Sequence, residues 1–361
     1  MTNRKLASIR KISSIEAIPE ADKIIKVNVD GWSLVSAKEN GFMPGDSVVF
    51  FEVDSFLPVE ERYEFLRKSC YKETKHLGSG FRLKTIKLKE TISQGLVMPL
   101  EKGENSSGVP VYVITGKNGE KHEVEVGDDV TEVLGVQLYE KPIDSKLSGI
   151  VRGNFPALVR KTDQERVQNI LGELMYDMEV KWEVSMKLDG SSMTVYRKND
   201  EIHVCSRNID LVETEENTFW QVANRLKIPS VLNWLGRNLA FQGELMGPGV
   251  QGNREWLKSH TFFLFDIWDI DKQRYFTPQE RRSLVSTIND SGFELPHIHV
   301  FGEKQLKDFG KSYEEMLNNL LTYATGPSIY NEVREGIVLK RDDGSFSFKV
   351  ISQEFLLKEK D

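Results

Sequence analysis

The residues with the clearest chemical potential stand together in the stretch Lys187-Leu188-Asp189-Gly190. A lysine amine attacks an electrophile only in its neutral form, and with an ordinary pKa of about 10.4 it is neutral in roughly one molecule in 2,500 at pH 7. Lowering that pKa by about 3 units takes roughly 4 kcal/mol of differential interaction. Partial burial and a nearby divalent cation both lower it, because both disfavour the ammonium ion. Lys187 could therefore act as a nucleophile only if its surroundings did this, since most lysines are solvated surface charges.

The chain around Lys187 has the pattern of strands. Apolar and polar residues alternate over residues 180–185, which is the period of a strand, and Asp189-Gly190 is a turn signal that ends it. A second strand follows over residues 191–197. We therefore expect Lys187 at the mouth of a hairpin.

Other segments of the second half end in acids, bases or aromatic residues. Thr162 or Asp163 can cap a helix whose apolar face follows a helical period, and a further helical segment covers residues 278–286. The apolar face of the first helix is Val167, Ile170, Leu171 and Leu174. Strand-like runs occupy residues 201–207, 239–247, 262–269, 335–340 and 346–350.

Composition limits the class of protein. The 361 residues suggest about two domains, and 39% hydrophobic with 29% charged residues fits a globular protein. The net charge of −7 excludes a simple nucleic-acid coat protein, so any polyanion must be bound by a local patch. No apolar run is long enough to span a bilayer, and the N-terminus has no apolar signal core. Cys70 and Cys205 form no disulfide framework, so we expect a reducing, cytoplasmic compartment.

The first part of the chain is rich in short strands. Residues 24–29, 32–36 and 47–52 are apolar or alternating runs separated by turn signals, which is typical of a small barrel, an OB-like barrel being one candidate. Residues 109–115 and 121–126 flank a hairpin signal, and residues 128–134 look like a short helix. We expect a β-rich domain over residues 1–140, a linker over 141–156 and a second domain over 157–361.

Residues 67–89 form a basic window, with eight cations and one acid interleaved with aromatic residues. In an acidic protein such a window can bind polyphosphate or nucleic acid, and Arg82, Lys84 and Lys87 are the candidate contacts. The alternative is a solvated face.

Six elements in one order resemble the covalent nucleotidyltransferase superfamily of polynucleotide ligases and capping enzymes. They are Lys187-x-Asp189-Gly190, Ser206-Arg207-Asn208, Gly243-Glu244, Phe265-Asp266, Glu335-Gly336-x-Val338-x-Lys340, and Lys349. Residues 81–100, with Ser93-Gln94-Gly95-Leu96, and residues 161–169 resemble the nick-sealing RNA ligases of the Deinococcus/Naegleria type.

The resemblance implies an α+β fold. An ATP-grasp-like nucleotidyltransferase domain of antiparallel sheets with flanking helices would follow an embellished OB-fold domain. It implies an ATP-dependent RNA ligase that works through three nucleotidyl transfers and a lysyl-AMP intermediate. The expected cofactors are ATP with Mg²⁺ or Mn²⁺. The expected partner is RNA in a nicked duplex, with RNA/DNA hybrids as a further option, and we expect a monomer.

The resemblance also assigns residue roles. Asp189, Glu244 and Glu335 match the positions that hold a hydrated metal, with Lys187 as nucleophile. The contacts to the nucleotide would come from Glu183, Ser185, Met186, Leu188, Arg207, Asn208, Phe265, Lys340 and Lys349, Phe265 being the ring that stacks on adenine. Arg166 joins the three residues of the basic window as a candidate phosphate contact.

Two departures from the family pattern stand out. Ligases often carry Glu one or two residues before the lysine, where this chain has Ser185 and Met186, so Glu183, Ser185 or backbone groups would read adenine. The last motif often reads Lys-x-Lys, whereas Ser347 stands two residues before Lys349 here.

Two other functions are compatible with these residues. A capping-type guanylyltransferase would be labelled by GTP, but such enzymes carry their OB domain after the catalytic domain. A non-catalytic nucleic-acid-binding protein with a decayed ligase fold would be labelled by neither nucleotide. The intact Lys187 and acids argue against decay.

Overall fold

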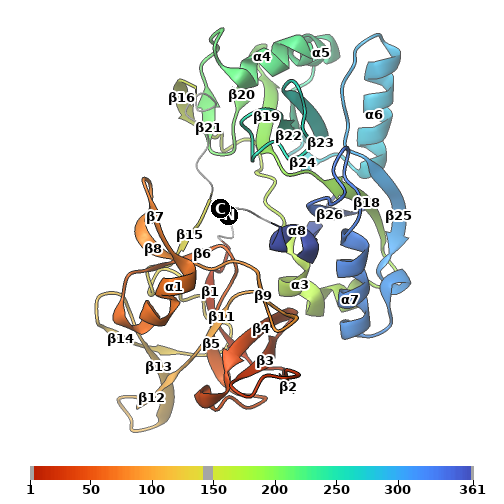
Figure 1. Cartoon of the computed structure of the whole chain (residues 1–361). Coiled ribbons are helices and arrows are strands. Elements are labelled where there is room, and N and C mark those ends of the chain that lie inside the picture. The colour runs from red at the N-terminus through yellow and green to blue at the C-terminus, as the bar shows by residue number, and fades with distance from the viewer. Residues whose placement is uncertain (1–3, 141–148, 359–361) are drawn as a thin grey trace. The chain divides into compact units, whose positions relative to one another are not determined.

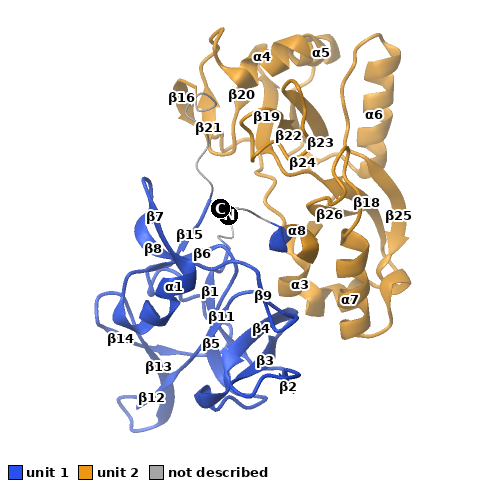
Figure 2. Cartoon of the chain, viewed as in Figure 1, with its two compact units in different colours: residues 1–142, 356–361 blue, residues 143–355 orange. Residues whose placement is uncertain are grey.

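The chain forms two compact units (Figure 2), one of residues 1–142 with 356–361 and the other of residues 143–355. The computed structural model describes residues 4–140 and 149–358. Both units are rich in strands, and most helices belong to the second (Figure 1). In the described part of the chain, no helix has the length and apolarity needed to cross a membrane.

Short antiparallel sheets build the first unit. One has the order β1-β5-β11, a second β2-β3-β4 and a third β15-β6-β8-β7, while β12-β13-β14 and β9-β10 form the others. The elements are β1 (Ala7–Lys11), β2 (Ser14–Ala17), β3 (Ile24–Val29), β4 (Trp32–Ala37), β5 (Ser47–Phe51), β6 (Ser55–Pro58), α1 (Arg67–Cys70), β7 (Tyr71–Thr74), β8 (Gly78–Arg82), β9 (Ile86–Leu88), β10 (Thr91–Ser93), β11 (Leu96–Pro99), β12 (Glu101–Glu104), β13 (Pro110–Thr115), β14 (Lys121–Val124) and β15 (Gln137–Leu138).

The predicted strands of this unit are confirmed, but the predicted helix over 128–134 is wrong. The segment is a series of turns bonded to β1, in which Ile9 N–H donates to Asp128 O and Val130 N–H donates to Ala7 O. The Thr131 hydroxyl accepts from the Leu6 and Ala7 amides. The neighbouring strand thus supplies the backbone partners that a helix would otherwise provide.

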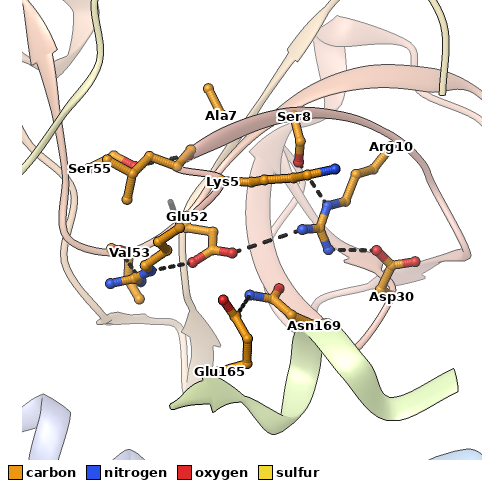
Figure 3. Close-up of polar contacts among 12 residues, drawn as sticks. Lys5, Ala7, Ser8, Arg10, Asp30, Glu52, Val53, Ser55, Glu165 and Asn169 are labelled. Atoms are coloured by element: carbon orange, nitrogen blue, oxygen red, sulfur yellow. Dashed lines mark hydrogen bonds and ion pairs between the residues drawn. The ribbon is translucent and has the colours of Figure 1, made fainter. Parts of the chain in front are cut away.

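A buried carboxylate ties the ends of these sheets together (Figure 3). Glu52 is fully buried, and its Oε2 accepts from Arg4 Nε at 2.7 Å. Arg10 lies 3.9 Å from the other oxygen of Glu52 and pairs with Asp30 at 2.7 Å. Two guanidinium groups thus compensate one charge that would be costly to bury alone.

The basic window differs from the prediction at Arg82. This side chain is buried, its guanidinium lies 4.2 Å from the ring centroid of Tyr139, and it is 3.9 Å from Asp54. Arg82 thus lies in the core and not on an exposed face, and its predicted contact with nucleic acid stays a prediction. Lys87 is exposed and pairs with Glu90, and Lys84 is half-buried.

The second unit contains two sheets with helices packed on them. One sheet has the order β16-β21-β20-β19-β22-β23-β24 and the other β17-β27-β26-β18-β25. The strands are β16 (Val151–Asn154), β17 (Glu165–Arg166), β18 (Lys181–Lys187), β19 (Ser191–Lys198), β20 (Glu201–Cys205), β21 (Ile209–Leu211), β22 (Leu239–Met246), β23 (Thr261–Asp269), β24 (Arg274–Tyr275), β25 (Val300–Gln305), β26 (Gly336–Arg341) and β27 (Ser347–Ile351). The helices are α3 (Val167–Leu174), α4 (Thr218–Arg225), α5 (Ile228–Leu235), α6 (Pro278–Asp290), α7 (Tyr313–Ala324) and α8 (Gln353–Leu357).

The predicted hairpin at Lys187 is wrong in a way that matters for the site. Strand β18 pairs with β25 on one edge and β26 on the other, so neither edge is free for β19, which pairs with β20 and β22 in the other sheet. The turn after Lys187 therefore passes from one sheet to the next. A Cβ on Gly190 would lie 2.5 Å from Leu245 O, so only glycine fits this crossing.

Helix α3 has the predicted buried face but not the predicted cap. Its N-cap is Arg166, which makes no side-chain cap bond, because Glu165 and Arg166 pair in parallel with β27. Its apolar residues pack with α7 on one face of the second sheet. Helix α6 starts where predicted, behind a capping box of Thr277 and Glu280, and continues to Asp290.

The predicted linker falls partly outside the described residues, which omit 141–148. Val151–Asn154 form an edge strand on β21. This part of the segment therefore belongs to the second unit.

Candidate active site

Lys187 is the last residue of β18 and lies opposite Gly336 on β26. Its Nζ donates to Glu335 Oε2 at 2.7 Å. Both side chains are mostly buried, with 22% and 15% of their surface exposed. The pairing of the two strands thus fixes the amine against a carboxylate from 148 residues further along the chain.

Two more acids surround the amine. Glu244 on β22 accepts from the Gly190 amide at 3.1 Å, and Asp189 lies 3.3 Å from Arg254. Burial alone would lower the pKa of Lys187, but the charges of Glu335, Glu244 and Asp189 outweigh it and raise that pKa above its ordinary value. Burial raises the pKa of Glu244 to about 8; Lys187 opposes this rise, and Glu335 and Asp189 add to it. The three acids thus outnumber the two cations beside them, Lys187 and Arg254, and the raised pKa of Glu244 keeps its carboxyl group protonated near neutral pH.

The three acids are of the right chemical type to bind a cation, but their side chains are not close together. Carboxylate oxygens are the ligands that Mg²⁺ prefers, and their mutual repulsion here would be relieved by a positive ion. Within residues 4–140 and 149–358, no three His, Cys, Asp or Glu side chains come close enough together to hold a metal directly. The arrangement fits an ion bound largely through water, and the predicted metal set stays a prediction.

A pocket of about 450 Å³ is lined by Met186 and Leu188, the neighbours of Lys187 in the chain. Apolar side chains from β18 and β23 line it, with a wall formed by the chain before and at the start of β25. The lining residues are Met186, Leu188, Phe263, Arg282, His297, Ile298, His299, Val300 and Ile329. Met186 and Leu188 are among them, and their predicted contacts with the nucleotide stay a prediction.

Phe263 is the aromatic residue that lines this pocket, whereas Phe265 was predicted. Both alternate onto the half-buried face of β23 and join the same apolar cluster with Met186 and Ile298. A bulge in the pairing of β22 with β23, between Gln242 and Gly243, shifts the register at this point. The stacking role of Phe265 stays a prediction, and Phe263 is its neighbour on the same face that lines the pocket.

The wall of the pocket is bonded to both sheets. Leu264 on β23 donates to Pro296 O at 2.9 Å and accepts from Ile298 N–H at 3.0 Å. Met186 on β18 donates to His299 O at 2.9 Å. Residues 296–299 thus join the sheet of Glu244 to the sheet of Lys187.

A buried ionic network lies behind this wall. Both oxygens of Glu183 are taken by Arg281 and Arg282 of α6, and Arg281 Nε donates to His297 Nε2 at 2.9 Å. Glu183 therefore supports the pocket wall, and its predicted contact with adenine is not favoured.

Lys340 pairs with Asp266 in the same buried region. Burial lowers the pKa of Lys340 to about 7, with Glu183 opposing. Lys340 is thus buried against an acid in this structure, and its predicted phosphate contact stays a prediction.

Lys349 lies on the same face of the sheet as Lys187. It lies opposite Val338, which lies opposite Ser185, so these residues share one face with Lys187. Arg166 is its parallel neighbour on β17 and is buried, and its predicted phosphate contact stays a prediction.

Arg207 and Asn208 lie at an exposed rim. Arg207 pairs with Asp163 at 3.0 Å, and Asn208 accepts from Lys161 at 2.8 Å. Arg207 is thus held in an ion pair, and its predicted contact with the nucleotide stays a prediction.

Sequence reasoning missed Arg254, Arg281, Arg282 and His297. A signal existed for Arg281, because the buried positions of α6 are Pro278, Arg281, Val285 and Ile288, which follow a helical period. Arg254 had none, since it lies in a loop.

The partly buried ring of His297 makes the stability of the protein depend on pH. Its Nδ1 donates to Ile298 O at 2.7 Å and its Nε2 accepts from Arg281, so the ring is neutral. Burial, aided by the charge of Arg281, lowers the pKa of His297 to about 4. The unfolded chain then binds a proton more readily between pH 6.5 and 4, so stability is full above pH 6.5 and falls toward pH 4. We expect His297→Gln to lose less stability than the parent from pH 7 to 4.5, by on the order of 2 kcal/mol. Thermal unfolding at both pH values measures this, and equal losses would contradict it.

Comparison with known proteins gives consistent matches. A family model described as RNA ligase matches residues 180–351, and an OB-fold domain model matches residues 6–100. An apo mutant of Naegleria gruberi RNA ligase is 44% identical, with 99% of each chain covered and a TM-score of 0.87. A mutant of the same ligase with ATP and Mn is 43% identical over 98% of each chain (TM-score 0.86), and the ligase with PPi is 43% identical over 99% of each (TM-score 0.85). No curated protein sequence matches the chain significantly.

Proposed function

The chain belongs to the RNA ligase family, and from this membership we propose that it seals breaks between a 3′-hydroxyl and a 5′-phosphate in RNA at the expense of ATP. The observation that carries the proposal is the amine of Lys187, held at 2.7 Å from Glu335. The charges of Glu244 and Asp189 also act on this amine and favour its protonated form.

In the proposed reaction Lys187 bonds to the α-phosphorus of ATP as pyrophosphate leaves, which gives lysyl-AMP. The AMP then passes to the 5′-phosphate of RNA, and the 3′-hydroxyl displaces it. Glu335 orients the amine, and Lys349, on the same face, is placed to meet phosphate as a point charge.

The pocket suits the nucleoside. Its volume of about 450 Å³ is in the range of small-ligand sites, and Phe263 offers a ring for stacking. Ser185 and Met186 replace the glutamate that often reads adenine, so backbone groups of the wall are the candidate readers.

Asp189, Glu244 and Glu335 are the residues that would hold a divalent cation. Such an ion, when bound, offsets charge at the α-phosphate and competes with the amine for these carboxylates, which favours the neutral amine. Structures of Naegleria gruberi RNA ligase with ATP and Mn and with AMP and Mn are among the relatives.

The substrate we propose is a nick in duplex RNA, with RNA/DNA hybrids as a second possibility to test, and the working form is a monomer. Cys70 and Cys205 are both free, which fits the cytoplasmic compartment that we propose.

The test uses α-labelled ATP or GTP with Mg²⁺ or Mn²⁺, followed by nicked duplexes with RNA or DNA on each side of the break. We expect label on the protein from ATP and sealing of RNA. Label from GTP alone would indicate a guanylyltransferase, and no label from either would indicate a non-catalytic binding protein.

A further inference from the structure

Two aromatic side chains beside the active site lie in solvent. Trp256 is 70% exposed and Tyr330 is 66% exposed. They belong to two loops that are distant in sequence, one after β22 and one before β26. Large rings normally gain by burial, so two exposed rings on adjoining loops call for a physical reason.

The loops are bonded to each other next to these rings. Glu255 is buried, and its Oε2 accepts from the amides of Tyr330 and Asn331 at 2.7 and 3.2 Å. Asn331 in turn donates to Arg254 O at 3.0 Å. Trp256 and Tyr330 therefore lie on neighbouring backbone segments that are fixed by hydrogen bonds.

The same loops are bonded to the catalytic residues. Arg254 pairs with Asp189 at 3.3 Å, and its guanidinium lies 4.2 Å from the ring centroid of Phe355. On the other loop, Ile329 lines the nucleotide pocket while the next residue, Tyr330, faces solvent. The exposed rings thus adjoin the border of the pocket.

Trp256 is also held in an unusual backbone conformation. Its φ is +49°, in the left-handed region that disfavours bulky side chains. Its amide donates to Asn253 O at 2.9 Å, and Asn253 has a φ of +48°. A strained loop that displays an apolar ring indicates a contact made outside the chain.

We propose that Trp256 and Tyr330 pack against the RNA at the break and stack on the base faces that the interruption of the strand leaves open. This rests on the proposed function, which brings RNA to Lys187. Aromatic rings stack on any base, so the contact would hold strands of varied sequence. Lys258, exposed two residues after Trp256, is placed to meet the phosphate backbone.

The test measures binding of a fluorescently labelled nicked RNA duplex, without nucleotide, at several salt concentrations. The variants are Trp256→Ala, Tyr330→Ala and Trp256→Phe, with Tyr176→Ala as the matched control, because Tyr176 is 91% exposed elsewhere in the same unit. Labelling of each protein by α-labelled ATP without RNA is measured in parallel.

We expect each alanine variant to bind RNA roughly 5- to 150-fold more weakly, the range for loss of a stacked base. Trp256→Phe and Tyr176→Ala should bind nearly as well as the parent. The slope of log affinity against log salt should not change, because no phosphate contact is removed. RNA affinity equal to that of the parent in both alanine variants would overturn the proposal, as would loss of ATP labelling together with RNA binding, which would indicate damage to the loops. An unlabelled parent protein would instead count against the proposed function.

Discussion

Replacement of Lys187 by alanine is expected to abolish labelling of the protein by α-labelled ATP and, with it, sealing of RNA. The amine is the atom that bonds to phosphorus, and no neighbouring group can substitute for it as a covalent carrier. Lys187→Arg is expected to fail equally. A guanidinium keeps the positive charge beside Glu335 but does not lose its proton at ordinary pH.

The two variants together separate charge from nucleophilicity. Lys181→Ala is the matched control, because Lys181 is an exposed lysine at the start of the same strand. It should be labelled like the parent. Labelled Lys187→Ala protein, with unfolding temperature unchanged, would remove the assignment of the nucleophile.

Glu335→Gln is expected to reduce labelling by roughly 100-fold or more at every pH, the size of effect that loss of a metal's help to the transition state produces. A decrease in the labelling rate is informative, because the effect of Glu335 on the pKa of Lys187 alone would predict an increase. Glu335 raises the pKa of Lys187, so neutralising it should make the amine easier to deprotonate. A loss at all pH values would therefore mean that the carboxylate serves the bound cation as well as the amine.

The measurement is the rate of labelling between pH 6 and 9 at several metal concentrations. Glu332→Gln, an exposed acid three residues earlier, is the control and should match the parent. A faster Glu335→Gln enzyme with its optimum moved to lower pH would show that Glu335 acts only as the ion-pair partner of Lys187.

The strands that carry the site were predictable from the sequence because their pattern is local. Alternation around Trp182 and Val184, and the apolar runs before Glu244 and Asp266, place β18, β22 and β23 within a residue or two. The order of the motifs then identified Lys187 and its acids.

The pairing of those strands was not predictable in the same way. Whether β18 turns back on itself or passes to another sheet depends on β25 and β26, which follow more than 100 residues later. Burial of charged residues was missed for a related reason. Arginines such as Arg82 and Arg281 are normally expected in solvent. Their burial is energetically possible because the fold places partners such as Tyr139 and Glu183 against them, which compensate for the lost hydration.

The hydrogen bonds of residues 296–299 to both sheets have a consequence for selectivity. A wall anchored on two sides cannot swing aside to admit a larger base without breaking bonds to Leu264 and Met186 at once. We therefore expect the wall to keep its position when a nucleotide binds, so that selectivity would depend on the groups along the edge of a base that fit this fixed surface.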